Sequence, residues 1–229
     1  MPHSILVINP NSSESVTSGL RDTLSPPPDT TLTFYTAPSH APPSINDLTT
    51  ANLTATACFE DILAKGLVEL YDGFLVCCFS DHPLIHMLRE TTPKPTIGIL
   101  QSAIVHALLI GDRFSVVSTG SGYRYNRHAE IRACLGGDSA RFAGIVMTGL
   151  GVVELREGER AHVESAMKDA SAKAAASGAD VLLLGCAGMA GMEVLVQQGV
   201  AEAGLKSVRI VDGAKAGVQF LASLIRLSE

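Results

Sequence analysis

Residues 73–78 have the sequence Gly73-Phe74-Leu75-Val76-Cys77-Cys78, a short apolar run that ends in two cysteines. A similar run, Val181-Leu182-Leu183-Leu184-Gly185-Cys186, follows a little under half of the 229-residue chain later. Short apolar runs bounded by turn residues are typical of strands buried on both faces of a parallel sheet. We therefore expect Cys78 and Cys186 to emerge at the carboxyl ends of two equivalent strands, where their thiols face one cleft.

Apolar runs alternate with helix-like stretches along the whole chain, and this alternation predicts an α/β fold with parallel sheets and helices on both sheet faces. The predicted strands are Ile5–Ile8, Thr31–Tyr35, Gly73–Cys77, Thr96–Ile99, Phe114–Ser118, Arg141–Met147, Val181–Leu184 and Ser207–Val211. The predicted helices are Ser13–Leu24, Thr50–Tyr71, Pro83–Thr91, Ser102–Leu109, Arg124–Cys134, Glu157–Ala176, Met189–Ala203 and Ala214–Leu227.

The order of these elements repeats, since Ile5–Asn9 resembles Phe114–Ser118 at nearly the same offset as the two cysteine runs. Any α/β chain has roughly periodic strands, but the parallel repeats favour a duplication. We predict two pseudo-symmetric lobes, each with a roughly four-stranded parallel sheet flanked by helices, and an active site in the cleft between them. The first lobe is predicted to contain residues 1–100 and the C-terminal helix at about 214–229, and the second lobe residues 101–213.

Composition narrows the classes of partner. The net charge is −6, and the 17 Lys and Arg residues form no run, which argues against a nucleic-acid surface. No apolar stretch approaches the roughly 20 residues of a membrane helix. The five cysteines lack the spacing of a disulfide framework, and no secretion signal is evident, so we expect reduced thiols in a cytoplasmic protein. Small molecules are the expected partners.

Two strand-to-helix turns carry polar groups suited to a small ligand. The first is Ile8-Asn9-Pro10-Asn11-Ser12-Ser13, in which Ser12 or Ser13 is the expected N-cap. The second is Ser118-Thr119-Gly120-Ser121-Gly122, which lacks the Gly-Lys-Ser/Thr of a phosphate loop. Amides at such turns bind carboxylate or carbonyl oxygens. The two turns are either capped helix starts alone or parts of a site for a small anion or amide.

The cysteine turns are candidates for acid–base chemistry. Cys77 lies inside its apolar run and is expected in the core, whereas Cys78 is at the exit, close to a helix that begins at Pro83. A helix N-terminus lowers the pKa of a nearby thiol. Cys186 is followed by Ala187 and Gly188, which leave backbone amides open beside the sulfur. Either cysteine alone would more often be a core residue, but two at equivalent positions favour function.

Other chemistries of cysteine and histidine fit less well. His82 and His86 together with Cys78 imitate a metal site, but no second Cys/His pair has ligand spacing, so no metal is expected. The adjacent cysteines are not the Cys-x-x-Cys of a thiol–disulfide oxidoreductase. A cysteine–histidine hydrolase stays an alternative, because the pairing of such residues is spatial.

The segment 25–50 holds six of the 11 prolines. Its second part, Ala37–Asn46, follows a predicted strand, and it either overhangs the cleft or forms an ordinary surface loop.

Five motifs together resemble the aspartate/glutamate/hydantoin racemase superfamily, in its hydantoin and allantoin racemase branch and a fungal hydantoin-racemase-like subgroup. They are Ile8–Ser13 (INPN-[TS]-S), Pro43–Ile45 (P-x-S-I), Cys78–Asp81 (CFGD), Gly185–Met189 (GCAGM) and Val211-Asp212 with Ala216–Val218 (VDP-x-x-AG-[VA]). The chain departs from the family pattern at Ser80, at His82 and at Gly213, where proline is common. His82 is therefore expected to reach the pocket and alter substrate choice.

The resemblance implies an isomerase: a cofactor-independent racemase of 5-substituted hydantoins, with allantoin as one candidate, that uses two cysteines as the acid and the base. The implied catalytic residues are Cys78 and Cys186. The implied substrate-binding residues are Asn11, Ser80, Asp81, Ser118, Thr119, Ala187 and Gly188, with His82 and Ser44 as weaker candidates. It also implies no metal and no cofactor, and allows a homo-oligomer. The alternatives are a maleate-isomerase-like or decarboxylase-like enzyme of the same superfamily, or a catalytically inactive small-molecule binding protein.

Overall fold

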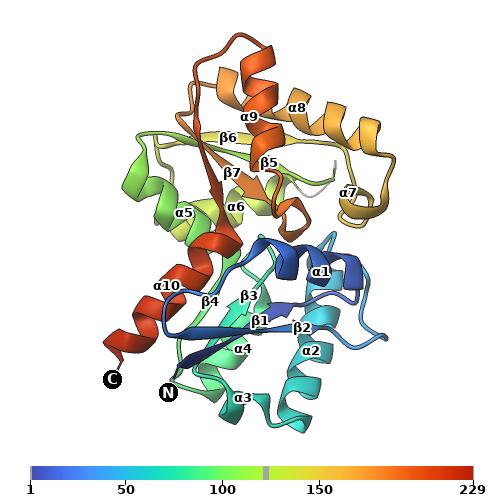
Figure 1. Cartoon of the computed structure of the whole chain (residues 1–229), viewed down its shortest axis with the longest axis vertical. Helices are drawn as coiled ribbons and strands as arrows, with labels where there is room; N and C mark the ends of the chain where they lie inside the picture. The colour runs from blue at the N-terminus through green and yellow to red at the C-terminus, as the bar shows by residue number, and fades with distance from the viewer. Residues whose placement is uncertain (1, 121–123, 229) are drawn as a thin grey trace.

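Two separate parallel sheets organise the computed structural model, which describes residues 2–120 and 124–228 (Figure 1). The first sheet has the order β2-β1-β3-β4 and contains β1 (His3–Asn9), β2 (Thr30–Thr36), β3 (Gly73–Val76) and β4 (Thr96–Gly98). The second has the order β6-β5-β7-β8 and contains β5 (Phe114–Ser118), β6 (Phe142–Met147), β7 (Val181–Gly185) and β8 (Arg209–Asp212). The predicted α/β architecture of two four-stranded lobes is confirmed.

The two lobes repeat the same strand order, so β3 and β7 occupy equivalent interior positions. β3 pairs with β1 and β4, and β7 pairs with β5 and β8, in parallel throughout. Every residue of both strands is buried. Cys186 follows β7 directly and Cys78 lies two residues beyond β3, so the repeat presents the two thiols from similar places.

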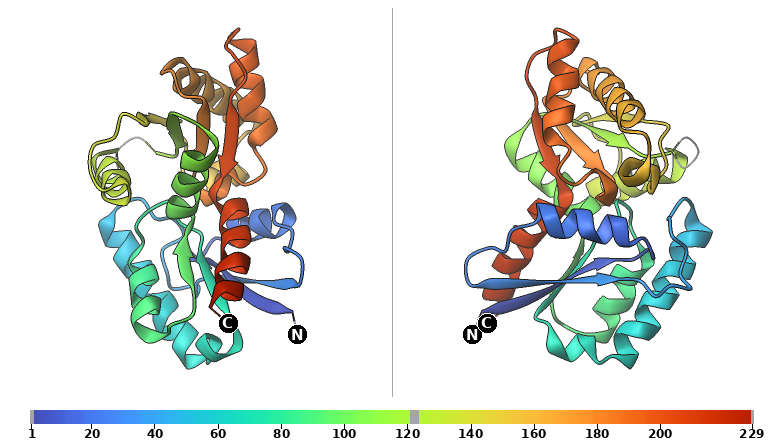
Figure 2. Two further views of the ribbon diagram at one scale, coloured as in Figure 1. Left: turned by 90° about the vertical axis from the view of Figure 1, so that its left-hand side faces the viewer. Right: turned by 45° about the vertical axis from the view of Figure 1, so that its right-hand side comes forward.

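The helices cover both faces of each sheet (Figure 2). They are α1 (Glu14–Thr23), α2 (Leu48–Ala64), α3 (Leu67–Leu70), α4 (Pro83–Thr91), α5 (Ile99–Ile110), α6 (Arg124–Leu135), α7 (Glu154–Glu157), α8 (Arg160–Ala176), α9 (Glu193–Glu202) and α10 (Gly213–Leu227), with a 3₁₀ turn at Ala187–Met189. The C-terminal helix α10 packs against β1 and β3 of the first sheet, and also against α5. The predicted division of the chain between the two lobes stays a prediction.

Three predicted helices are shorter or divided in the structure. The predicted helix 50–71 is interrupted at Gly66, whose φ of 62° lies in the left-handed region that ends helices. The predicted helix 157–176 is divided at Gly158 into α7 and α8. The predicted helix 189–203 begins only at Glu193, because the 3₁₀ turn after Cys186 leads into Gly191 at a φ of 85°.

The lobes share one hydrophobic core. A single cluster of buried side chains contains Val7 and Leu75 of the first sheet as well as Val116 and Leu183 of the second. A separate cluster, which includes Phe74 and Ile85, fills the far side of the first sheet. The shared cluster fixes how the lobes sit against each other. No helix of the described residues is both long and apolar enough to cross a membrane.

The chain passes between the lobes at two places, and these passages touch. One runs from β4 into α5 at Ile99, and the other runs from β8 into α10 at Gly213. A Cβ atom added to Gly213 would lie 3.0 Å from the Ile99 carbonyl carbon and closer still to its oxygen. The Asp212 carboxylate caps α10 by accepting from the N–H groups of Ala214 and Lys215. This close approach leaves no room for a Cβ atom at position 213.

Gly213→Ala is expected to destabilise the protein, since overpacking against rigid backbone costs about 1–3 kcal/mol. This cost exceeds the stabilisation of roughly 0.4–1 kcal/mol that a glycine-to-alanine change gives by reducing the conformational entropy of the unfolded chain. The expected fall in melting temperature is about 2–4 °C per kcal/mol. The matched control is Gly151→Ala, where the nearest atom to the added Cβ lies at 3.8 Å. Equal melting temperatures for both variants in a thermal scan would contradict the inferred contact.

Candidate active site

Cys78 and Cys186 line the same small cavity between the lobes, which has a volume of about 30 Å³. Asn11, Thr119 and Ala187, which the sequence also singled out, contribute to its lining. So does Ile45 of the proline-rich segment, which shows that this segment overhangs the cleft. Backbone and side-chain hydrogen bonds from Ser12 to the segment hold it there.

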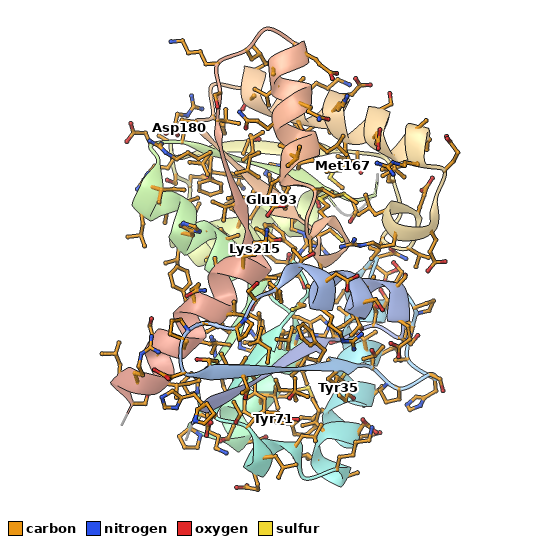
Figure 3. The ribbon with its side chains drawn as sticks, in the orientation of Figure 1. Tyr35, Tyr71, Met167, Asp180, Glu193 and Lys215 are labelled. Carbon is orange, nitrogen blue, oxygen red and sulfur yellow. The ribbon has the colours of Figure 1, made fainter. Side chains whose placement is uncertain are left out.

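The cavity has room for a water molecule but is far smaller than the roughly 300–1,000 Å³ of ordinary ligand pockets. A ring-sized ligand therefore requires the walls to move apart. A larger hollow of about 590 Å³ lies beside α10, where Lys215 pairs with Glu193 (Figure 3). None of the cysteines lines that hollow, so the thiol pair and not the volume identifies the candidate active site.

The Cys78 sulfur is buried and accepts a hydrogen bond from the Ser80 hydroxyl. Burial raises the pKa of Cys78 to about 11, and the Cys186 thiolate and Glu130 add to the increase. The Arg127 guanidinium and a hydrogen bond of 3.0 Å from the Ser80 hydroxyl to the sulfur oppose it. Cys78 is therefore a thiol near neutral pH, and it can act as a proton donor.

The Cys186 thiol has more groups that favour its ionised form. Burial raises its pKa, but the Gly188 N–H, 3.3 Å from the sulfur, and a hydrogen bond with the Thr119 side chain lower it. The guanidinium groups of Arg127 and Arg156 lower it further. Both cysteines thus have a donor two residues further along the chain, and Cys186 has a second guanidinium, that of Arg156, in addition to that of Arg127.

Arg127 is a member of the site that the sequence did not reveal. It lines the thiol cavity from α6, and its Nη1 lies 2.7 Å from Oε2 of Glu130. Its guanidinium also lies 6.0 Å from the centre of the Phe79 ring. An arginine in a polar helix ordinarily faces solvent, and the one signal in the sequence was the Arg-x-x-Glu spacing, which is too common to be specific.

The remaining predicted binding residues lie at different depths. Asn11 is buried, and its side-chain oxygen accepts from the Ser13 N–H and from Asn9 Nδ2, so its own amide nitrogen is the group that can donate to a ligand. Ser13 is the N-cap of α1, but its side chain makes no capping bond. Ser118 is buried with its hydroxyl donating to the Gly185 carbonyl. The predicted turn residues Ser121 and Gly122 lie outside the described residues.

Three other candidates lie away from the cavity lining. His82 is fully buried, caps α4 by accepting from the Leu84 N–H, and contacts the Thr54 hydroxyl through Nε2. Burial lowers the pKa of His82 to about 4, so it is neutral near pH 7. Asp81 is exposed and pairs with His86. Ser44 is half-buried and bonds to Asn46 within the loop. Their roles in substrate binding stay predictions.

The other cysteines have separate environments. Cys77 is buried in the shared core, as predicted from its position inside the apolar run. Cys58 is buried in the first lobe, whereas Cys134 is exposed on α6. Within residues 2–120 and 124–228, no group of three or more His, Cys, Asp or Glu side chains is arranged to hold a metal ion.

The fold and the thiol pair together define a class of protein. Its members have two similar α/β lobes, and the candidate site takes one cysteine from each lobe. The family model described as Asp/Glu/Hydantoin racemase matches residues 5–221, and the chain belongs to this family. Membership confirms the predicted resemblance and the prediction of a racemase, which is an isomerase.

Relatives cover nearly the whole chain. An uncharacterized Schizosaccharomyces pombe protein is 39% identical over 98% of this chain and 92% of its own length. A hydantoin racemase from a Pseudomonas species is 30% identical over 98% of this chain and 87% of its own. Among solved structures, an allantoin racemase from Klebsiella pneumoniae has a TM-score of 0.84 at 25% identity, covering 99% of this chain and 89% of that one.

Ser80→Ala is expected to slow the alkylation of Cys78 by iodoacetamide. Loss of the hydroxyl donor raises the pKa of Cys78, and each unit of that increase lowers the thiolate fraction tenfold. We expect a roughly three- to tenfold fall in rate at pH 8, measured by mass spectrometry of the Cys78 peptide, because one such bond is worth about 1 kcal/mol. Ser223→Ala, on the exposed face of α10, is the control. An unchanged rate in Ser80→Ala would show that the bond does not affect the thiol.

Proposed function

We propose that this protein racemises 5-substituted hydantoins without a cofactor, by proton transfer between Cys78 and Cys186. The observation that carries the proposal is the pair of thiols at the ends of β3 and β7, which share one interlobe cavity and each have a hydrogen-bond donor at the sulfur. Relatives named hydantoin racemase and a structural neighbour named allantoin racemase support this substrate class. Allantoin is the particular substrate that we place first.

The unequal thiols provide an acid and a base at once. In one direction the Cys186 thiolate takes the proton from the ring carbon next to the carbonyl, and the C–H electrons move onto the carbonyl oxygen. The Cys78 thiol then returns its own proton to the opposite face of the same carbon. The reverse reaction exchanges the two roles. General acid–base catalysis of this kind works best when one group is ionised and the other protonated at the working pH.

The oxygen that gains charge needs donors in the cavity. The amide nitrogen of Asn11 and the hydroxyl of Thr119 lie on the lining, and the amides of the turn at Ala187 and Gly188 lie beside Cys186. Donors fixed in a site with little water stabilise an enolate more than water does.

Each single change, Cys78→Ala or Cys186→Ala, is expected to reduce racemisation by roughly 10²–10⁴-fold, the usual contribution of a positioned acid or base. One enantiomer of a hydantoin is incubated in D₂O, with optical rotation and deuterium at the ring carbon both followed. Cys134→Ala, which removes an exposed thiol, is the control and is expected to keep wild-type rates. Near wild-type racemisation in either active-site variant would disprove the two-thiol mechanism.

Other substrates separate the alternatives. Loss of CO₂ from a substituted malonate would indicate a decarboxylase-like reaction, and cis–trans isomerisation of maleate would indicate a maleate-isomerase-like one. Ligand-induced thermal stabilisation without deuterium uptake would indicate a binding protein that has lost turnover.

The rate of racemisation is expected to rise with pH from about 6 to 9. The pKa values of both thiols lie above the ordinary value, so near pH 6 almost every molecule has two thiols and lacks the base. Raising the pH increases the population with one thiolate by about tenfold per unit until the first proton of the pair is lost. The measurement is kcat/KM against pH, with spontaneous exchange subtracted. A flat profile over this range would mean that the thiols do not supply the base.

A further inference from the structure

We propose that Arg127 is a catalytic residue, whose guanidinium donates hydrogen bonds to the substrate oxygen that becomes negative when the proton leaves. This inference rests on the proposed racemase function. It adds a full positive charge to a site for which the sequence predicted amide and hydroxyl donors alone.

The position of Arg127 carries the inference. Its side chain lines the cavity that contains both Cys78 and Cys186, and only 11% of it is exposed. Among the described residues that line this cavity, it is the one with a full charge. Its guanidinium lowers the pKa of both thiols, so its charge acts on the two sulfurs between which the reacting carbon must lie. A substrate bound between the sulfurs therefore lies within reach of this cation.

The side chain is fixed before any ligand arrives. Glu130, one turn further along α6, binds Nη1 at 2.7 Å and is itself largely buried. A hydrogen bond from the Asp81 backbone N–H to Glu130 connects the helix to the turn that contains Cys78. The Phe79 ring supports the other side of the guanidinium at 6.0 Å. Donors held in this way need little reorganisation as charge develops in the reaction.

The chemistry of the group suits an enolate. A guanidinium has five N–H donors in a rigid fork, so one such group can bind several oxygen acceptors at the same time. When the C–H bond breaks, the proton moves to the Cys186 sulfur and the electron pair moves to the carbonyl oxygen. Arg127 donates to that oxygen and keeps its own protons, because its pKa is far above neutral. The bond is strongest when the oxygen is charged, which favours the transition state over the bound substrate.

Three variants of the full-length protein test this role in the deuterium-exchange assay. Arg127→Met is expected to lower kcat by roughly 10²–10³-fold with little change in KM, as when an oxyanion donor is lost. Arg127→Lys keeps the positive charge but lacks the planar guanidinium with its fixed donors, and its kcat is expected to fall at least about tenfold. The matched control is Arg132→Met on the same helix, whose partner is the exposed Asp138, and it is expected to retain wild-type kinetics.

A readout that a structural role would not change is chemical rescue. Millimolar guanidinium chloride is expected to restore exchange by Arg127→Ala at least several-fold and to leave Cys186→Ala inactive. Slower alkylation of Cys186 in Arg127→Met is expected as well, because the cation favours the thiolate. This second readout requires no turnover.

Wild-type turnover tests the proposed function, and the variants test Arg127. If the wild type racemises a hydantoin and Arg127→Met retains its kcat within about threefold, the role of Arg127 is overturned while the proposed function stands. A loss confined to KM, or the absence of rescue, also overturns it. Should Arg127→Met fail to fold, Arg127→Lys decides, and full activity of that variant rejects the proposal.

Discussion

The structure depends on burying two parallel strands, β3 and β7, on both of their faces. Neither face of such a strand can have polar side chains exposed to solvent. The residues just after the strand therefore determine which side chains lie at the carboxyl edge of the sheet. Because both sheets are parallel and repeat one strand order, the edges that follow β3 and β7 meet at the interlobe cavity. The shared core cluster then prevents the lobes from choosing another arrangement. The placement of the two thiols is a consequence of core packing.

Burial at this edge also determines the electrostatics of the site. It favours the protonated form of each thiol, so the balance between the two sulfurs rests on the few groups that contact them. Arg127 and Ser80 favour the ionised form of Cys78, whereas the Gly188 amide, Thr119, Arg127 and Arg156 favour that of Cys186. Glu130, on α6 of the second lobe, works in the opposite direction and raises the pKa of Cys78. Two nearly symmetric halves thereby produce an unsymmetric pair.

The sequence predicted the strands well because their signal is local. The run Phe114–Ser118 combines Phe and Val with two small serines between polar flanking residues, and the structure reproduces this strand residue for residue. Helix ends were less predictable, since Gly66 and Gly158 end helices through backbone conformation and packing that composition alone does not specify. The cysteine pair was found because each thiol follows a strand. Arg127 was not found, and the overhang of the segment that contains Ile45 was only one of two alternatives, since both depend on how α6 and the proline-rich segment fold over the cavity.

The contact between Gly213 and the Ile99 carbonyl has a mechanical meaning. Both connections between the lobes pass through this point, where the backbone of Gly213 lies against the backbone carbonyl of Ile99. A widening of the cavity that keeps this contact is therefore a rotation of one lobe against the other about the crossing, and not a sliding of the lobes.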